Sequence, residues 1–203
     1  MNREFQEKDL VLATHNLGKI EEFKHLFGEV DFKINNIGQY SWEPPEESGM
    51  TFWENSLIKA REASKLTGMV SLADDSGLCV EILKGSPGVY SADWATLSDG
   101  SRDFEFAINK LVKEIERTGF VESVTAYFIC SLILYWPDNH FEKFEGRIHG
   151  EIIWPGRGRE GHGYDPVFLP NGYKKTFGEM DRWKKNKISH RGLAVKNLLK
   201  ACF

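Results

Sequence analysis

The spacing of apolar residues predicts most of the helices and strands in this chain. The clearest helix has an apolar face formed by Phe104, Ile108, Leu111 and Ile115. Gly119 follows as a residue that can end it. The clearest strand runs from Val124 to Trp136, where every even-numbered position is apolar and Thr125, Tyr127, Ser131 and Tyr135 stand among the odd ones.

Two further helices are predicted in the N-terminal part. A short strand, Leu10 to Ala13, precedes a loop and then a helix whose apolar face carries Ile20, Phe23 and Phe27 and which Gly28 can end. Thr51 and Glu54 fit a capping box that opens a second helix running toward Gly68. Its predicted inner side consists of Leu57, Ala60 and Leu66.

The remaining segments predict strands and a final helix. A short strand over 70–73 is expected to break at 74–77 and to resume from Leu78 to Ile82. The turn at 137–139 predicts that 140–153 folds back as an antiparallel strand, and 167–169 is a further short strand. Ser189 can cap a C-terminal helix with His190 and Arg191 in its first turn. This order predicts an α/β fold with a long mixed sheet flanked by helices.

Length and composition fit one folded domain over 1–203, with two lobes. Of the 203 residues 41% are hydrophobic, which is enough to form a core. The net charge of -4 argues against nucleic-acid binding. Three cysteines without paired spacing indicate no disulfide framework, and no apolar run is long enough for a membrane span. We therefore expect a cytoplasmic protein with no membrane partner.

The loop before the first helix is a candidate phosphate site. It reads Thr14, His15, Asn16, Leu17, Gly18 and Lys19, so backbone N–H groups and one ammonium lie at a helix N-terminus. It is not a Walker A loop, because Ala13 stands where that motif needs glycine and Ile20 where it needs Ser or Thr. A plain strand-to-helix connection explains the same residues.

Three acidic residues are candidates for metal binding. Asp74 and Asp75 are adjacent after a buried strand, where a divalent cation would relieve their repulsion. Neighbours in an extended chain point in opposite directions, so only one need face a metal, and a capping role explains either of them equally well. Glu54 is explained by the capping box alone, and it becomes a ligand only if its helix begins beside Asp75.

Planar side chains in the C-terminal half are candidates for binding a base. His162 and Tyr164 lie in a glycine-rich loop, although single residues of this kind are usually surface groups. His190 and Arg191 place two potential cations at a helix N-terminus, which opposes the helix dipole unless an anion compensates. The nearby lysines, of which Lys185 is one, are a solvated run or part of a triphosphate pocket.

Several motifs in order make the chain resemble one family, the inosine triphosphate pyrophosphatases, also called Ham1-like proteins. The motifs are 14–19, 51–55 with Lys59 and Arg61, 73–77, 85–88, 90–92, 163–166, 175–177, 179–180 and 189–191. The resemblance extends from about residue 10 to the C-terminus. It implies an α/β protein with two lobes and a central substrate cleft, usually a homodimer. It also implies Mg²⁺-dependent hydrolysis of ITP, dITP and XTP to a monophosphate and pyrophosphate.

The resemblance also assigns roles. It implies that 14–19 holds the phosphates, that Glu54 and Asp75 serve the metal, and that Asp75 accepts the proton from water. The remaining substrate contacts that it implies are Ser76, His162, Gly163, Tyr164, Asp165, Lys185, His190 and Arg191. Donors from the His-Arg pair would favour purines with oxygen at C6. His162 departs from the family, where phenylalanine is common, so its stacking role is open.

Two other functions compete with this interpretation. A pyrophosphatase of Maf-like architecture would act on other nucleotides with similar phosphate chemistry. A non-catalytic nucleotide- or RNA-binding module would use His162, Tyr164 and Trp94 for stacking. The acidic net charge and the carboxylate pair count against the binding module. Metal-dependent turnover would distinguish an enzyme from such a module.

Overall fold

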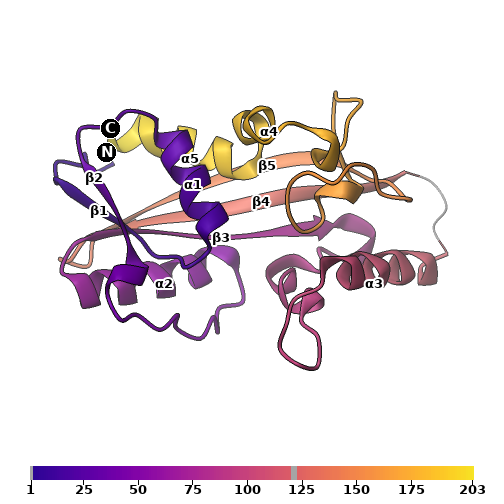
Figure 1. The fold of residues 1–203 in the computed structure, drawn as a ribbon, viewed down its shortest axis with the longest axis horizontal. Coiled ribbons are helices and arrows are strands. Elements are labelled where there is room, and N and C mark those ends of the chain that lie inside the picture. The colour runs from indigo at the N-terminus through magenta and orange to yellow at the C-terminus, as the bar shows by residue number, and fades with distance from the viewer. Residues whose placement is uncertain (1, 120–122) are drawn as a thin grey trace. The chain divides into compact units, whose positions relative to one another are not determined.

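The computed structural model describes residues 2–119 and 123–203. Its strands are β1 (Asp9–Leu12), β2 (Lys33–Asn36), β3 (Val70–Val80), β4 (Val124–Tyr135), β5 (Phe141–Ile152) and β6 (Phe168–Pro170). Its α-helices are α1 (Leu17–Phe27), α2 (Phe52–Thr67), α3 (Phe104–Arg117), α4 (Arg182–Ile188) and α5 (His190–Cys202) (Figure 1).

The strands form one sheet in the order β2-β1-β3-β4-β5-β6. β1 is parallel to both β2 and β3, whereas β5 and β6 are antiparallel. The sheet is therefore mixed, and the predicted α/β class is confirmed. The chain divides into two compact units, and β3, β4 and β5 each contribute residues to both. The predicted central cleft stays a prediction.

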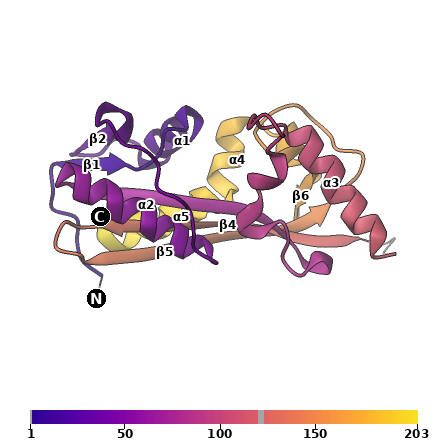
Figure 2. The same ribbon diagram turned by 90° about the horizontal axis from the view of Figure 1, so that it is seen from below.

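The first unit comprises 1–75, 130–146 and 190–203 and is layered on both faces of its strands. Even-numbered strand residues such as Leu10, Leu72 and Leu132 pack with α1 and α5, and odd-numbered ones such as Val11, Ala73 and Ile133 pack with α2. Figures 1 and 2 show α2 on one side of these strands and the pair α1 and α5 on the other. Successive side chains of a strand point to opposite faces, so neighbouring residues meet different helices.

The second unit comprises 76–129 and 147–189 and has its own core. The predicted helix is confirmed as α3, which begins after the N-cap Asp103 and buries Ala107, Ile108, Leu111 and Ile115. These side chains pack with residues of β3, β4 and β6, among them Leu78, Phe128 and Phe168.

The predicted break in β3 is wrong. The strand continues without interruption from Val70 to Val80 through both aspartates and Gly77. Consecutive carboxylates argue against a buried strand only while nothing compensates their charge, and here cations from other elements lie beside each of them. Leu66 was also placed wrongly: it is 52% exposed and lies outside the inner face of α2.

Other boundaries agree to within a residue or two. α1 ends at Gly28, and α2 has the predicted capping box and ends at Gly68. β5 and β6 occupy the predicted segments, with β6 shifted by one residue. Neither β2 nor α4 was predicted, because each is short and carries no clear apolar period.

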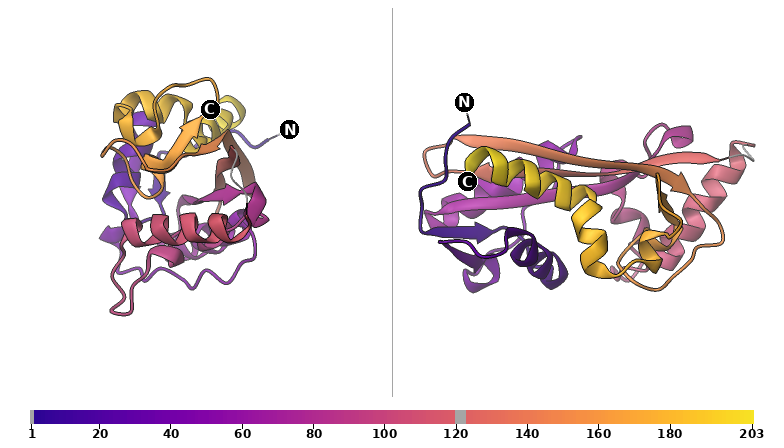
Figure 3. Two further views of the ribbon diagram at one scale, coloured as in Figure 1. Left: turned by 90° about the vertical axis from the view of Figure 1, so that its right-hand side faces the viewer. Right: turned by 90° about the horizontal axis from the view of Figure 1, so that it is seen from above.

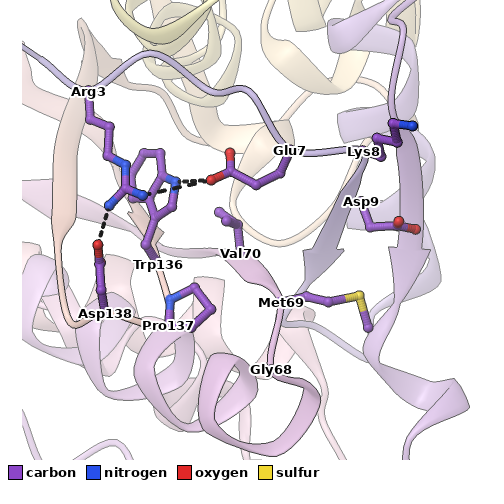
Figure 4. A pocket seen from close by; sticks show the side chains of 10 residues that line it. All are labelled: Arg3, Glu7, Lys8, Asp9, Gly68, Met69, Val70, Trp136, Pro137 and Asp138. Atoms are coloured by element: carbon purple, nitrogen blue, oxygen red, sulfur yellow. Dashed lines mark hydrogen bonds and ion pairs between the residues drawn. The ribbon is translucent and has the colours of Figure 1, made fainter.

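The N-terminal segment lies against the end of α5 (Figure 3), where the Phe5 N–H donates to the Cys202 carbonyl at 2.7 Å. Beside it is a pocket of about 440 Å³ at the amino ends of β1 and β3 (Figure 4). Arg3 crosses this pocket, stacks on Trp136 at 4.8 Å and binds Asp138 at 2.6 Å. None of the predicted site residues lines it. No helix in the described ranges is long and apolar enough to cross a bilayer.

Candidate active site

The predicted phosphate loop connects β1 to α1. Asn16 is the N-cap of α1, and its Oδ1 accepts a hydrogen bond from the Lys19 N–H at 3.1 Å. Thr14 Oγ1 accepts from the Asn16 N–H at 3.2 Å. His15 donates from Nε2 to the Trp42 carbonyl at 3.0 Å, and Leu17 is 70% exposed. The loop is thus ordered by its own polar side chains at the carboxyl end of β1.

Asp74 lies on the face of β3 that is covered by α1 and α5. Lys19 Nζ is 3.0 Å from its Oδ1, and Arg191 Nη2 is 2.8 Å from its Oδ2. Burial opposes ionisation of Asp74, but the positive charges of Lys19 and Arg191 outweigh it and hold the pKa well below its usual range. Asp74 is therefore a fixed anion between two helices.

Asp75 lies on the opposite face and meets α2. Asn55 Nδ2 donates to its Oδ2 at 3.2 Å, and Lys59 Nζ is 3.8 Å from its Oδ1. Burial raises the pKa of Asp75 to about 6 even though the Lys59 charge opposes the increase, and the Glu47 charge adds to it. The pKa of Asp75 is therefore raised where that of Asp74 is lowered, although the two residues are adjacent in β3.

Lys59 joins Asp75 to a second carboxylate. Its Nζ is 3.1 Å from Glu47 Oε1, in the loop before α2. Burial alone would lower the pKa of Lys59, but the carboxylates of Asp75, Asp74 and Glu47 together raise it. Lys59 therefore stays charged between two acidic side chains that are far apart in sequence.

Glu54, the predicted metal ligand, takes part in the capping box of α2. Its Oε2 accepts from the N–H groups of Met50 and Thr51 at 2.9 and 3.0 Å. This is the capping role that the sequence left open. The same loop brings Glu47, rather than Glu54, to the lysine that contacts Asp75.

The compensating anions expected for the start of α5 are present. Arg191 Nη1 is 2.6 Å from Glu22 Oε2, and Nη2 binds Asp74. His190 is buried next to it. Ion pairs thus link Lys19 and Arg191 to Asp74 and Glu22 on one face of β3, and Lys59 to Glu47 and Asp75 on the other. Both terminal nitrogens of Arg191 bind protein carboxylates, so a contact with a base stays a prediction.

The second unit holds the other predicted substrate residues. Asp165 Oδ2 accepts from the His162 N–H at 2.7 Å and binds Lys185 Nζ at 2.5 Å. The Tyr164 hydroxyl donates to the Ser91 carbonyl at 3.0 Å, and burial raises its pKa. A Cβ on Gly161 would lie 2.0 Å from Asp165 Oδ2, so this close loop requires glycine.

Three of these residues are structural in this unit. Asp165, Tyr164 and Lys185 are each less than a tenth exposed and hold the loop together, whereas His162 is exposed and Gly163 carries a positive φ of 69°. Ser76 begins the unit immediately after Asp75 in β3. The substrate contacts of Ser76, of 162–165 and of Lys185 stay predictions.

Sequence reasoning missed four residues that contact Asp75, Lys59 or Arg191: Glu22, Glu47, Asn55 and Lys59. Asn55 and Lys59 stood in a family motif without a role, and their spacing of four residues on a helix was the available signal. Glu47 lies in an irregular loop, and Glu22 lies outside the apolar face predicted for α1. Neither sequence pattern therefore indicated that these carboxylates form ion pairs.

A lysine-bearing loop that joins the carboxyl end of a parallel strand to a helix N-terminus, beside a buried carboxylate of the neighbouring strand, is typical of α/β proteins that bind phosphorylated ligands. The sequence pattern of the Ham1 family matches residues 10–201, and the chain belongs to this family.

Relatives match the chain along its full length. The dITP/XTP pyrophosphatase of Ruegeria pomeroyi is 46% identical over 203 residues, covering 100% of this chain and 99% of that protein. The dITP/XTP pyrophosphatase of Rhizobium meliloti is 45% identical, with 98% of each covered. The structure of a HAM1 protein from Coxiella burnetii superposes with a TM-score of 0.88 at 35% identity, covering 96% of this chain and 98% of that one.

Proposed function

We propose that this protein is an Mg²⁺-dependent hydrolase that cleaves ITP, dITP and XTP to the nucleoside monophosphate and pyrophosphate. Full-length similarity to proteins named dITP/XTP pyrophosphatases supports the reaction. The observation that carries the proposal is the pair of carboxylates, Glu47 and Asp75, on either side of Lys59, with the Lys19 loop at the adjacent strand end.

The residues present fit a magnesium ion. Mg²⁺ commonly binds one or two protein carboxylates and completes its shell with water and substrate phosphates. The carboxylates of Asp75 and Glu47 offer oxygen ligands, and both already lie beside one cation, the Lys59 ammonium. Asp75 would be one ligand and Glu47 the second, in preference to Glu54, whose Oε2 is bound by two backbone N–H groups. When bound, the ion would neutralise phosphate charge and acidify water.

The protein's own groups supply the remaining chemistry. Cleavage between the α and β phosphates requires a base for the attacking water and positive charge at the leaving pyrophosphate. Asp75, with a pKa raised to about 6 by burial, is ionised at neutral pH and accepts that proton. The Lys19 side chain is 26% exposed and meets the phosphates, while Asp74 fixes its position.

The substrate contacts that the family resemblance assigns are His162 to Asp165, Ser76 and Lys185 in the second unit, and His190 and Arg191 in the first. Hypoxanthine and xanthine carry an acceptor oxygen at C6 where adenine has an amino donor, so donors in this set would reject adenine. An unmatched buried donor costs about 1–3 kcal/mol. The protein acts in the cytoplasm, a location with which its buried free cysteines are compatible, and as a homodimer.

The function is tested by pyrophosphate release from ITP, XTP, dITP, GTP and ATP, measured with Mg²⁺ and again with EDTA. We expect release from the first three, little from GTP and ATP, and none in EDTA. Preference for other nucleotides would favour a Maf-like activity. Binding without release under any metal would favour a non-catalytic module.

Separate substitutions of Glu47 and Glu54 test which of them serves the metal. Glu47→Gln should raise the Mg²⁺ concentration needed for half-maximal activity by at least about tenfold, because metal sites lose that much even when only a supporting group is changed. Glu54→Gln should change it little, since a glutamine oxygen can still accept from the capping N–H groups. The Mg²⁺ dependence of turnover measures both. A larger effect of Glu54→Gln would instead support Glu54 as the metal ligand, as the sequence predicted.

A further inference from the structure

Asn55 connects the two segments that carry the proposed metal carboxylates. Its Oδ1 accepts from the Gly49 N–H at 2.8 Å, two residues after Glu47, and its Nδ2 donates to Asp75 Oδ2 at 3.2 Å. The side chain is buried, with the residue 3% exposed. One amide group therefore bridges the loop before α2 and the middle of β3.

The orientation of this amide is determined by its partners. The Gly49 N–H can only donate, so it must face the amide oxygen, and the NH₂ group must then face Asp75 as an acceptor. The contact with the loop is close: a Cβ on Gly49 would lie 2.6 Å from Asn55 Oδ1 and 2.7 Å from the Glu54 Cβ. Glycine lets the loop lie directly on the amide.

Lys59 makes a second bridge between the same segments. It follows Asn55 by four residues on α2, so both side chains project from the same face of the helix. Its ammonium contacts Glu47 Oε1 and lies near Asp75 Oδ1. Each oxygen of Asp75 is thus approached from α2, one by the amide and one by the ammonium.

We propose that Asn55 is a positioning residue that sets the separation and orientation of the Glu47 and Asp75 carboxylates for the metal. This inference rests on the proposed function. Asparagine is less favourable than alanine within a helix. Asn55 does not cap α2, because that role belongs to Thr51, and its amide is used entirely on the two carboxylate-bearing segments.

Two substitutions separate the two ends of the bridge. Asn55→Leu removes both hydrogen bonds and keeps the number and branching of the side chain's heavy atoms. Asn55→Asp keeps an oxygen for the Gly49 N–H but replaces the donor to Asp75 with a second carboxylate oxygen, which repels Asp75. The matched control is Asn35→Leu, because Asn35 is also 3% exposed in the same unit and donates to an aspartate, Asp9, at 2.9 Å.

Three measurements are made on each protein. Electron paramagnetic resonance of free Mn²⁺ gives the affinity for Mn²⁺ without nucleotide. Steady-state kinetics give kcat and KM for ITP at saturating Mg²⁺, and hydrogen exchange is measured at the Gly49 amide. Asn55→Leu should weaken Mn²⁺ binding and lower kcat by about 10- to 100-fold, as for other groups that orient metal ligands. KM should change by less than about threefold, since the nucleotide contacts are intact. Hydrogen exchange of the Gly49 amide should accelerate in Asn55→Leu. Asn55→Asp should lower kcat but leave the exchange rate of the Gly49 amide unchanged.

The inference is overturned if folded Asn55→Leu binds Mn²⁺ and turns over at wild-type levels, or if Asn35→Leu loses as much of both. If Asn55→Leu fails to fold, the isosteric Asn55→Asp decides, and wild-type kcat in that variant overturns the inference. Failure of the proposed function is recognised separately, because the wild-type protein would then release no pyrophosphate with Mg²⁺ or would release it equally in EDTA.

Discussion

Asp75→Asn is expected to lower kcat by about 10²- to 10⁴-fold, the usual contribution of a positioned general base. The substitution preserves the shape of the side chain but removes the proton acceptor that burial has tuned to a pKa of about 6. It also removes a negative charge from the proposed metal site. The measurement is pyrophosphate release from ITP at saturating Mg²⁺.

Asp9→Asn is the control for this experiment. Asp9 also accepts a hydrogen bond from a buried asparagine, Asn35, yet it lies at the start of β1. Its substitution should leave kcat unchanged. If Asp75→Asn retained activity within a few-fold of wild type, Asp75 would be excluded as the base.

Arg191→Met is expected to destabilise the fold by about 3–5 kcal/mol, the usual effect of removing one partner from a buried ion pair. The guanidinium is almost entirely buried and binds both Glu22 and Asp74. Its loss removes the ion pair of Glu22 and leaves Asp74 with Lys19 as its remaining ion-pair partner. Urea unfolding of both proteins gives the difference in the free energy of unfolding. Arg61→Met is the control, since its ion pair with Glu62 is exposed and should contribute about 0–1 kcal/mol.

The Arg191→Met difference should depend on pH. In the wild-type protein the folded pKa of Asp74 is depressed, so its stabilisation is present above the unfolded pKa of about 3.9 and is lost only as pH falls through the lower folded value. Without Arg191, burial of Asp74 is less well compensated and its folded pKa rises. The destabilisation should therefore shrink as pH falls through the raised folded pKa of Asp74 in the variant. A difference that stayed constant through the acid limb, down to the pH where the wild-type protein loses stability, would show that lost packing, rather than charge, is responsible.

The amphipathic helices were predictable because their stability depends on a repeating apolar face. α3 buries the residues that its period selected, and α2 begins at the capping box that its sequence encodes. Local chemistry alone was sufficient for both. β2 and α4 were not predictable, since four and seven residues carry too little periodic information.

The error at 74–77 has a different origin. Two adjacent aspartates have low strand propensity, and the sequence around them contains no cation. Their compensation comes from Lys19, Lys59 and Arg191, which are distant in the chain and meet β3 only after folding. Local rules fail where long-range charge pairing decides, and this is also where the candidate site lies.

The roles of the candidate site residues stay predictions. The structure places Lys19, which was predicted to hold phosphates, against Asp74, and the opposite facing of Asp74 and Asp75 followed from strand geometry. Glu47 was not foreseen, because no pattern in an irregular loop indicates which carboxylate will reach Lys59. The resemblance to the family assigned the metal to Glu54 instead.

The alternation along β3 makes the two aspartates intolerant of any change in strand length. A single inserted or deleted residue between Val70 and Asp74 would turn each carboxylate to the other layer, so that Asp75 would meet the Lys19 and Arg191 charges and lose the α2 amide. The irregular loop before α2 is not paired with a neighbouring strand, so its side chains do not alternate between two layers. Among sequences of this family, we therefore expect gaps to be admitted in that loop and excluded from the strand.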